Sequence, residues 1–537
     1  MNECARASSV CLRAEEVKRS QISARVRERM THQIAGLVTS GLFWTLVLAL
    51  SIYLARSRRL MKLPQFWAED ATVFFHASLA DALVALVQPY AGYLHLGPRT
   101  VAALGALVPG TLAPTALYWG ACATAVFCSG AIYRLASPLQ NPYRVLTALA
   151  PLGALPGPEI YGNATNTQWF FGTLLGVLVA CYRRDRFPSR WWLVLGGYLS
   201  LTGPFSVILF PLLLCWAGIH KEIRINRAML IVVGSGATVQ LLILMRMGAN
   251  KYGEGIAELS SWMTAVEQLL KGFTSQHEWT AALVLTLLVL LLPLAATWVG
   301  RQGRGRDTLL PVAFLALAFV TLLAGIATHK HQPDLLSPIG AGARYFLEPF
   351  AFVLMALLAC HLAGGRRLGW LALALVFVLV FGWRKQMNVP AQPNQHWASY
   401  YRLSMVADDV VAPILPNWAM PLYRNTTSTL ADVQTIPLQH GADTSVGQLM
   451  FPVPPACAER REHFVRVSVA RTAKVELAVL DRLGGNAVRA ASGNIIGAGG
   501  HWYFAVPESR PSDMIRVDFP DALTPDIGLA LSWVCFD

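Results

Sequence analysis

The stretch that decides the fold is Phe66–Arg99, FWAEDATVFFHASLADALVALVQPYAGYLHLGPR, which follows the first long apolar segment of the chain. It carries two adjacent carboxylates, Glu69 and Asp70, among aromatic and apolar side chains. An apolar segment of spanning length that is followed at once by a polar stretch is typical of a chain that has just crossed a membrane. We therefore expect residues 55–111 to form the first loop on the far side of a bilayer.

The composition of the whole chain indicates a membrane protein with several spans. Of its 537 residues, 54% are hydrophobic and 14% are charged, whereas a soluble domain has about 25% charged residues. The formal net charge of +13 raises the question of nucleic acid. Most basic residues before the C-terminal region, however, lie in short loops between apolar segments, which is typical of topology signals. On this ground we expect no nucleic-acid partner.

The apolar segments predict about eleven membrane spans. Several are short for a membrane crossing, which takes about 20 apolar residues or somewhat fewer at the short end of the range. We expect a transmembrane domain at 34–383. Its apolar segments lie at 35–54, 112–133, 144–158, 166–182, 191–202, 205–218, 228–247, 279–299, 308–328, 344–363 and 368–383. The pair separated by Gly203 and Pro204 could instead be one kinked helix.

The distribution of Lys and Arg predicts the orientation. Residues 1–33 are polar and basic, and no signal-peptide pattern precedes them, so we expect a cytoplasmic tail. An interfacial amphipathic helix is the alternative, and Met30 is a second candidate start. With eleven spans, most of the remaining Lys and Arg face the cytoplasm, as the positive-inside rule requires. The cluster Arg56–Arg59 is the exception, and could contact lipid phosphates or bind an anionic ligand.

An odd number of spans places the rest of the chain on the external side. Residues 384–461 are rich in Pro, Asn and Trp without a clear period, and we expect a linker there. From 462 to 537, short alternating runs separated by turn residues predict a small antiparallel β-sandwich. Cys457 and Cys535 belong to this exported part. In an oxidising compartment they could form a disulfide, or they could remain two buried thiols.

The acidic pair is the first candidate for chemistry. Aromatic residues flank it on both sides, and partial loss of solvent raises the pKa of a carboxylate toward the range of a general base. Consecutive helix positions point about 100° apart, so the two side chains should differ in role. We assign Asp70 as the base and Glu69 as a positioning residue, and leave the reverse assignment open. A helix cap, or a salt bridge to nearby basic residues, is the alternative without chemistry.

A second group of candidates is cationic and lies mostly in the segment HKHQPDLLSPIGAGARY at 329–345. Cations stabilise the charge that develops on a leaving phosphate, and the arginine fork matches phosphate oxygens. Ordinary contact with lipid headgroups is the competing interpretation. The candidates in this segment are His329, Lys330, His331 and Arg344. Arg99, from the first loop, is a further candidate that could orient a carboxylate or pair with lipid phosphate. The histidines lack the further ligands of a zinc site, so no metal ligand is assigned.

A third group is amide-rich and opens an apolar segment, in the sequence GNATNTQWFF at 162–171. Amides and an indole face suit the hydroxyls and the apolar face of a sugar. Helix capping with an interfacial tryptophan is an equally good interpretation. The candidates are Asn163, Asn166, Gln168 and Trp169. No phosphate-binding GxxxxGK[ST] loop is present and no segment is left for a soluble nucleotide-sugar fold, so a sugar donor would have to arrive from the membrane.

These features together resemble the GT-C superfamily of integral membrane glycosyltransferases. The layout covers most of the chain, and the motif-level likeness lies at Glu69–Asp70 and at Arg344–Tyr345. The latter is similar to the arginine–aromatic step that several members place at the carrier phosphate. The β-rich C-terminal part resembles the carbohydrate-binding appendages of some members.

The resemblance implies a definite reaction and location. It implies transfer of a sugar from a polyprenyl-phosphate carrier to a glycan or lipid acceptor, with inversion, on the periplasmic side of a bacterial inner membrane. Donor, acceptor and membrane lipids are thus the expected partners. Some members use a divalent cation and others do not, so no cofactor is assigned.

Two interpretations without glycosyl transfer remain open. A transporter or flippase of lipid-linked glycans would place ionisable residues deep within its spans, and here the inner parts of the apolar segments carry almost no charge. A scaffold that binds envelope glycans through the C-terminal region is the other alternative.

Overall fold

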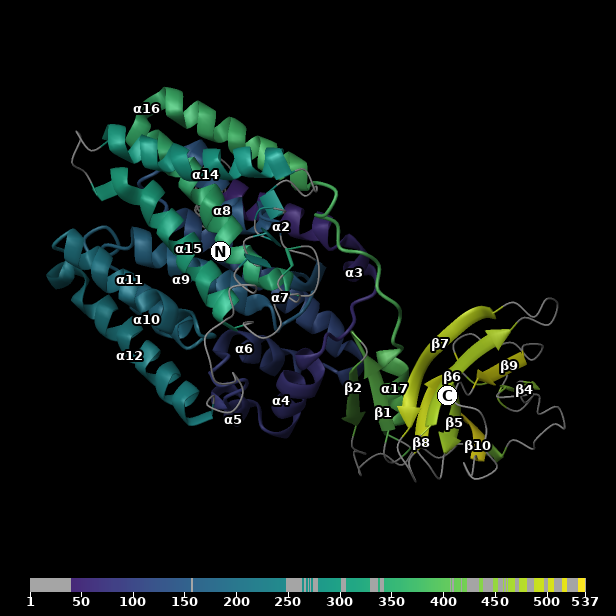
Figure 1. Cartoon of the computed structure of the whole chain (residues 1–537). Coiled ribbons are helices and arrows are strands. Elements are labelled where there is room, and N and C mark those ends of the chain that lie inside the picture. The colour runs from purple at the N-terminus through teal and green to yellow at the C-terminus, as the bar shows by residue number, and fades with distance from the viewer. Residues whose placement is uncertain are drawn as a thin grey trace, which may run out of the picture.

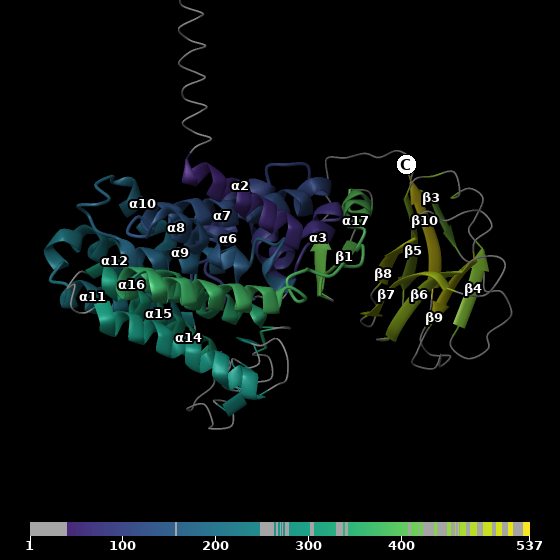
Figure 2. The same ribbon diagram turned by 90° about the horizontal axis from the view of Figure 1, so that it is seen from above.

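The computed structural model consists of a helical part and a smaller β-rich part, with α17 and the β1–β2 hairpin between them (Figures 1 and 2). The structure describes residues 40–155, 158–247, 263–264, 267–268, 270, 272–273, 279–300, 306–328, 337–338, 342–405, 407, 410–416, 418–422, 434–437, 448–452, 457, 460, 462–468, 473–480, 487–496, 501–506, 514–518 and 530–536. The predicted cytoplasmic tail at 1–33 therefore lies outside the described residues.

Helices account for most of the described chain. They are α2 (Gly41–Arg56), α3 (Arg58–Lys62), the π-helical η1 (Asp70–Phe75), α4 (His76–Ala80), α5 (Ala82–Val87), α6 (Leu96–Gly105), η2 (Gly110–Leu112), α7 (Ala113–Leu135), α8 (Asn141–Gly153), η3 (Pro158–Ile160), α9 (Thr167–Cys181), α10 (Trp191–Ser200), α11 (Phe205–Ile219), α12 (Ile223–Met247), α14 (Trp279–Gly300), η5 (Arg306–Leu309), α15 (Leu310–Thr328), η7 (Ala343–Phe346), α16 (Leu347–Trp383) and α17 (Trp397–Leu403).

The centre of the helical part is α9, in which every residue is buried. The first arm of α16 packs against it, and this contact requires a small residue. A Cβ atom on Gly176 would lie 2.3 Å from the ring of Phe352, so the two helices approach more closely than an alanine would allow. A mostly apolar helix that is enclosed on every side is the expected core of a helix bundle.

The helix α16 folds back on itself. Gly365 has φ +70°, a left-handed conformation that a side chain disfavours, and it interrupts the helical backbone. Beyond it the chain returns, so that the rings of Phe350 and Trp383 lie 5.3 Å apart. A straight helix would hold these rings about 50 Å apart. The two arms thus correspond to the separate apolar segments predicted at 344–363 and 368–383.

Four described helical stretches are long and apolar enough to cross a membrane, which is consistent with a membrane protein. They are Gly110–Leu135, Ile223–Met247, Arg306–Thr328 and Ala343–Trp383, while Gly41–Arg56, Thr167–Cys181, Phe205–Ile219 and Val284–Val299 are apolar but shorter. The predicted count of about eleven spans is therefore not supported. The physical reason is length: several predicted segments form helices of 10 to 16 residues, and a membrane crossing takes about 20.

The β-rich part consists of small antiparallel sheets. Its strands are β1 (Val410–Ile414), β2 (Trp418–Leu422), β3 (Gln434–Pro437), β4 (Gln448–Pro452), β5 (Glu462–Ser468), β6 (Ala473–Leu480), β7 (Ala487–Ile496), β8 (His501–Ala505), β9 (Met514–Asp518) and β10 (Ala530–Phe536). They form the hairpin β1-β2 and two four-stranded sheets with the orders β3-β10-β5-β8 and β4-β9-β6-β7. The predicted β-sandwich domain is therefore not supported, and the described residues of this region form only small antiparallel sheets.

The boundary predicted between the linker and the β-rich region needs correction. Strands β3 and β4 come from the predicted linker at 384–461, yet β3 pairs with β10 and β4 pairs with β9. They were missed because they are short and lie in a Pro-rich stretch without a period.

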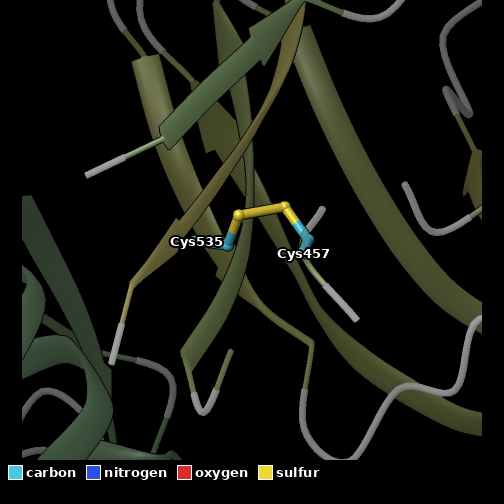
Figure 3. The surroundings of a disulfide bond; sticks show 2 residues. All are labelled: Cys457 and Cys535. Carbon is cyan, nitrogen blue, oxygen red and sulfur yellow. A yellow bond between two sulfur atoms is a disulfide. The ribbon is translucent and has the colours of Figure 1, made fainter. Parts of the chain in front are cut away.

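A disulfide joins Cys457 to Cys535 on β10, with Cα atoms 5.5 Å apart, so the predicted bond is present in the structure (Figure 3).

The remainder of the predicted linker packs onto the first loop. Leu415, which follows β1, accepts a hydrogen bond from the amide of Ala68 at 2.5 Å and donates its own amide to the carbonyl of Phe66 at 3.2 Å. The phenol of Tyr400 on α17 donates to the carbonyl of Tyr503 on β8 at 2.7 Å. The backbone just before the acidic pair is therefore held by the C-terminal region.

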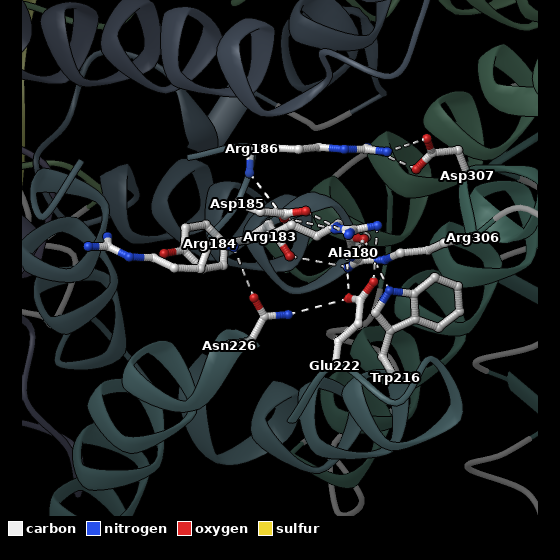
Figure 4. A network of polar contacts seen from close by, with 11 residues as sticks. Ala180, Arg183, Arg184, Asp185, Arg186, Trp216, Glu222, Asn226, Arg306 and Asp307 are labelled. Atoms are coloured by element: carbon white, nitrogen blue, oxygen red, sulfur yellow. Dashed lines mark hydrogen bonds and ion pairs between the residues drawn. The ribbon is translucent and has the colours of Figure 1, made fainter. Parts of the chain in front are cut away.

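A network of ion pairs lies at the opposite end of α9 from the first loop. Glu222 pairs with Arg306 at 2.7 Å and with Arg183 at 3.4 Å, and Arg186 pairs with Asp307 at 2.7 Å (Figure 4). These contacts join the turn after α9, the turn between α11 and α12, and η5. The charged groups at this end are thus paired with one another.

Candidate functional site

The carboxylate of Asp70 is a buried anchor for a distant turn. The residue is 1% exposed, and its oxygens accept hydrogen bonds from the Thr165 amide at 2.7 Å, the Thr165 hydroxyl at 2.6 Å and the Ala164 amide at 3.1 Å. Burial raises the pKa of Asp70 to about 7, although these three donors favour the charged form. A substrate hydroxyl cannot approach a carboxylate enclosed in this way. This arrangement argues against the assignment of Asp70 as the base.

Glu69 is the accessible member of the acidic pair. It is half-buried, and among the described residues no hydrogen bond occupies its carboxylate. Burial raises the pKa of Tyr90. The nearby charge of Glu69 raises this pKa further, and the charge of Arg344 lowers it. Glu69 therefore lies within electrostatic reach of both side chains. The first loop and the segment that carries Arg344 thus lie in the same region of the structure.

Arg344 is oriented by a residue that the sequence analysis missed. Glu159, in η3, forms an ion pair with the Arg344 guanidinium and accepts a hydrogen bond from the Gly342 amide at 3.2 Å. Burial raises the pKa of Glu159, Arg344 lowers it, and Glu69 raises it again. The Arg344 side chain remains 28% exposed. The cation is thus held in place and still reachable from outside.

Glu159 also organises the amide-rich loop through its main chain. Its carbonyl oxygen accepts hydrogen bonds from the side-chain amides of Asn163 at 2.6 Å and Asn166 at 2.7 Å. The side-chain oxygen of Asn166, Oδ1, in turn accepts from the Trp169 indole at 3.2 Å. Gln168 is buried as well. These four residues are buried, which argues against direct sugar contact by them. The predicted alternative of helix capping with an interfacial tryptophan is not observed either, because the Asn166 side chain makes no capping hydrogen bond to α9 and Trp169 is buried.

Tyr345 continues this chain of contacts. Its ring meets the Trp169 ring edge to face, with centroids 5.0 Å apart, and the Arg344 guanidinium lies 5.2 Å from the Tyr345 ring centre. The predicted arginine–aromatic step is thus braced by the 158–169 loop. The cationic candidates His329, Lys330 and His331 lie outside the described residues.

The basic cluster after the first apolar helix is partly structural. Arg56 is buried, and its guanidinium donates to the carbonyls of Leu152 at 2.6 Å, Ala154 at 2.9 Å and Met387 at 3.1 Å. Arg56 therefore ties α2, the end of α8 and the segment after α16 together. It is not free to bind lipid phosphate, in contrast to Arg59, which is exposed.

Arg99 lies apart from Glu69 and Arg344. It lines a cleft of about 630 Å³ in the first loop, together with residues of η1, α4 and α5 and the segment that follows α5. Tyr90 also lines this cleft, whereas Glu69, Asp70 and Arg344 do not. Tyr90 is thus the residue common to the cleft and to the charged cluster. Within the described residues, no group of three His, Cys, Asp or Glu side chains is arranged to hold a metal ion.

Comparison of the chain with protein family models and with curated protein sequences finds no match.

Proposed function

We propose that this protein is a membrane glycosyltransferase of the GT-C type that uses a polyprenyl-phosphate sugar donor. The observation that carries the proposal is that a half-buried carboxylate, Glu69, and an oriented, partly exposed cation, Arg344, lie within electrostatic reach of the same residue, Tyr90. A base and a phosphate-binding cation in the same region of a helix bundle suit a reaction on a membrane-embedded substrate.

In the proposed mechanism, Glu69 takes the proton from the acceptor hydroxyl as the hydroxyl oxygen attacks the anomeric carbon. The bond between that carbon and the phosphate oxygen breaks, and the polyprenyl phosphate leaves with the electron pair. Arg344 stabilises the charge that develops on the leaving phosphate. Because attack and departure occur on opposite faces, the anomeric centre is inverted. No step requires a metal ion, and a role for a divalent cation stays open.

Asp70 and Glu159 act as positioning residues in this mechanism. Asp70 holds the 164–165 turn, and Glu159 holds both that loop and Arg344. Each is buried and already engaged by several donors. Their replacement should therefore disturb the geometry of the site and the stability of the fold, whereas replacement of Glu69 should remove the proton acceptor itself.

The proposal is tested with the full chain in proteoliposomes and a panel of polyprenyl-phosphate sugars, by measuring release of polyprenyl phosphate with added envelope lipids as acceptors. We expect Glu69→Gln to lower turnover by about 100-fold or more, and Arg344→Gln to weaken it strongly. Asp185→Asn, in the distant ion-pair network, is the matched control and should retain full activity. Unchanged turnover in both Glu69→Gln and Arg344→Gln would falsify the assignment.

One observation favours transport as a second candidate. Glu348 is buried within the candidate span Ala343–Trp383, and its Oε1 atom has no hydrogen-bond partner among the described residues. An ionisable residue inside a span is often part of a substrate or proton path. Glu348→Gln separates the two functions, because a transporter would lose flux of lipid-linked glycan across the proteoliposome membrane while a transferase would keep its turnover.

A further inference from the structure

The cleft in the first loop contains a buried cation, Arg99, that forms no ion pair with any of the described residues. Arg99 is 1% exposed, and its Nε and Nη1 atoms have no hydrogen-bond partner within the described residues. Its guanidinium lies 5.2 Å from the ring centre of Phe74. Burial lowers the pKa of Arg99 to about 10, so the side chain is still charged at neutral pH. An unpaired charge removed from water costs several kcal/mol.

The surrounding residues do not neutralise this charge. Burial, and then the proximity of Arg99, lower the pKa of His95 to about 3, so this neighbour is uncharged at neutral pH. Asp81 lines the cleft and carries a negative charge, but it is exposed to water and forms no ion pair with Arg99. Its Oδ1 atom instead accepts from the amides of Leu83 and Val84, both at 3.0 Å. The cleft therefore presents a positive charge at its buried wall together with polar groups from His76, Gln88 and Tyr90.

The rim of the same cleft is apolar and exposed. Val84 and Val87 line it, and Leu83 on the same short helix is 79% exposed. Leu79, at the end of α4, adds a further exposed apolar side chain. Adjacent exposed apolar residues beside a polar cleft are typical of a surface that contacts lipid chains. The cleft thus combines a cation at depth with a hydrocarbon-compatible edge.

We infer that this cleft binds the anionic headgroup of a membrane lipid, with the headgroup phosphate on Arg99 and the acyl chains against α5. The positive charge of Arg99 favours an anionic ligand. The exposed apolar rim favours a lipid over free phosphate, because only a lipid has chains that can pack against it. This site is separate from the one proposed for the carrier phosphate at Arg344. Tyr90, which faces both, would connect a lipid in the cleft to the Glu69 carboxylate.

The test measures binding to the purified full chain in detergent, by native mass spectrometry over a titration with dioctanoyl phosphatidic acid. Dioctanoylglycerol, which has the same chains and no phosphate, and inorganic phosphate are the comparison probes. We expect saturable binding of the phosphatidic acid, weakened by roughly tenfold or more in Arg99→Gln. Arg190→Gln, which removes an exposed arginine outside the first loop, just before α10, should bind as the wild type does.

A second variant keeps the inference open to refutation if Arg99→Gln does not fold. Ala80 is exposed at the cleft and ends α4, so Ala80→Trp should fill the mouth while Arg99 stays in place, and should weaken binding by a similar factor. Equal affinity for dioctanoylglycerol, full competition by inorganic phosphate, or unchanged binding in Ala80→Trp each overturns the lipid assignment. Glu69→Gln should bind normally, so failure of this site is distinguishable from failure of the proposed transfer reaction.

Discussion

The substitution Asp70→Asn should change how the stability of the protein depends on pH. The carboxyl group is buried, and its pKa is raised from an ordinary value of 3.8 to about 7. Because the folded state holds this proton more tightly than the unfolded state, Asp70 stabilises the fold fully below about pH 4. That contribution is lost as the pH rises toward 7.

The size of the effect follows from the two pKa values. Each pKa unit corresponds to about 1.4 kcal/mol, so the change from 3.8 to about 7 amounts to roughly 4 kcal/mol as an upper limit. In a chain of this size such a difference shifts the melting temperature by on the order of 5 °C. The asparagine introduced by Asp70→Asn has no titrating proton, and the variant should lack this part of the pH dependence, even if the loss of a hydrogen-bond acceptor lowers its stability throughout.

The assay is thermal unfolding of the full chain in detergent, followed by intrinsic fluorescence between pH 4 and pH 8. Since many groups titrate, the informative quantity is the difference in melting temperature between wild type and Asp70→Asn at each pH. We expect this difference to shrink or reverse as the pH rises. Asp185→Asn, which alters an exposed carboxylate, is the control. Parallel profiles for wild type and Asp70→Asn over this range would refute the reasoning.

Three further substitutions test the site and the fold. Glu159→Gln should release Arg344 and lower the rate of sugar transfer by about tenfold, with the larger effect on KM for the donor, because the cation loses the partner that orients it. Gly176→Leu should lower the melting temperature markedly, since its side chain must occupy the space of Phe352. Cys535→Ser should make the C-terminal region more sensitive to limited proteolysis, because removal of a native disulfide costs about 2–5 kcal/mol.

Each of these has its own control. The control for Glu159→Gln is Arg402→Gln, on α17. It removes an arginine elsewhere in the chain and should leave the KM for the donor unchanged. Gly218→Ala places a methyl group where nothing lies within 4 Å and should leave the melting temperature unchanged or slightly higher. For the disulfide, the wild-type protein treated with reductant should match Cys535→Ser in its proteolysis pattern. A reduced wild type as resistant as the oxidised one would contradict the stabilising role of the bond.

Much of the β-rich region could be predicted from the sequence because alternation is a local signal. The five runs from HFVRVSVA to LALSWVCF correspond to β5, β6, β8, β9 and β10. The strand β7 was not predicted, since AVRAASGNII contains Gly and Asn and lacks a clear period. The number of spans was overestimated because apolar composition does not reveal how long each helix will be.

The candidate site was predictable in its location and less so in its roles. The aromatic surroundings of Glu69–Asp70 correctly indicated burial, but the extent of that burial depends on the distant backbone of residues 164–165. Glu159 was overlooked because it stands directly after the predicted span 144–158, where it resembles an ordinary boundary charge. Only the tertiary contact with Arg344 reveals its importance.

The pairing of Leu415 with the backbone of Phe66 and Ala68 has a consequence for how the chain can be divided. The residues after α16 supply a hydrogen-bonded partner for the strand-like segment that leads into Glu69. A shortened protein that stops near residue 383 would keep its apolar helices, but that segment would lose its hydrogen-bonded partner, the backbone of Leu415. Exchanging the C-terminal region for that of another protein would therefore alter the position of the Glu69 carboxylate. The helical part and the C-terminal region have to be expressed and engineered together.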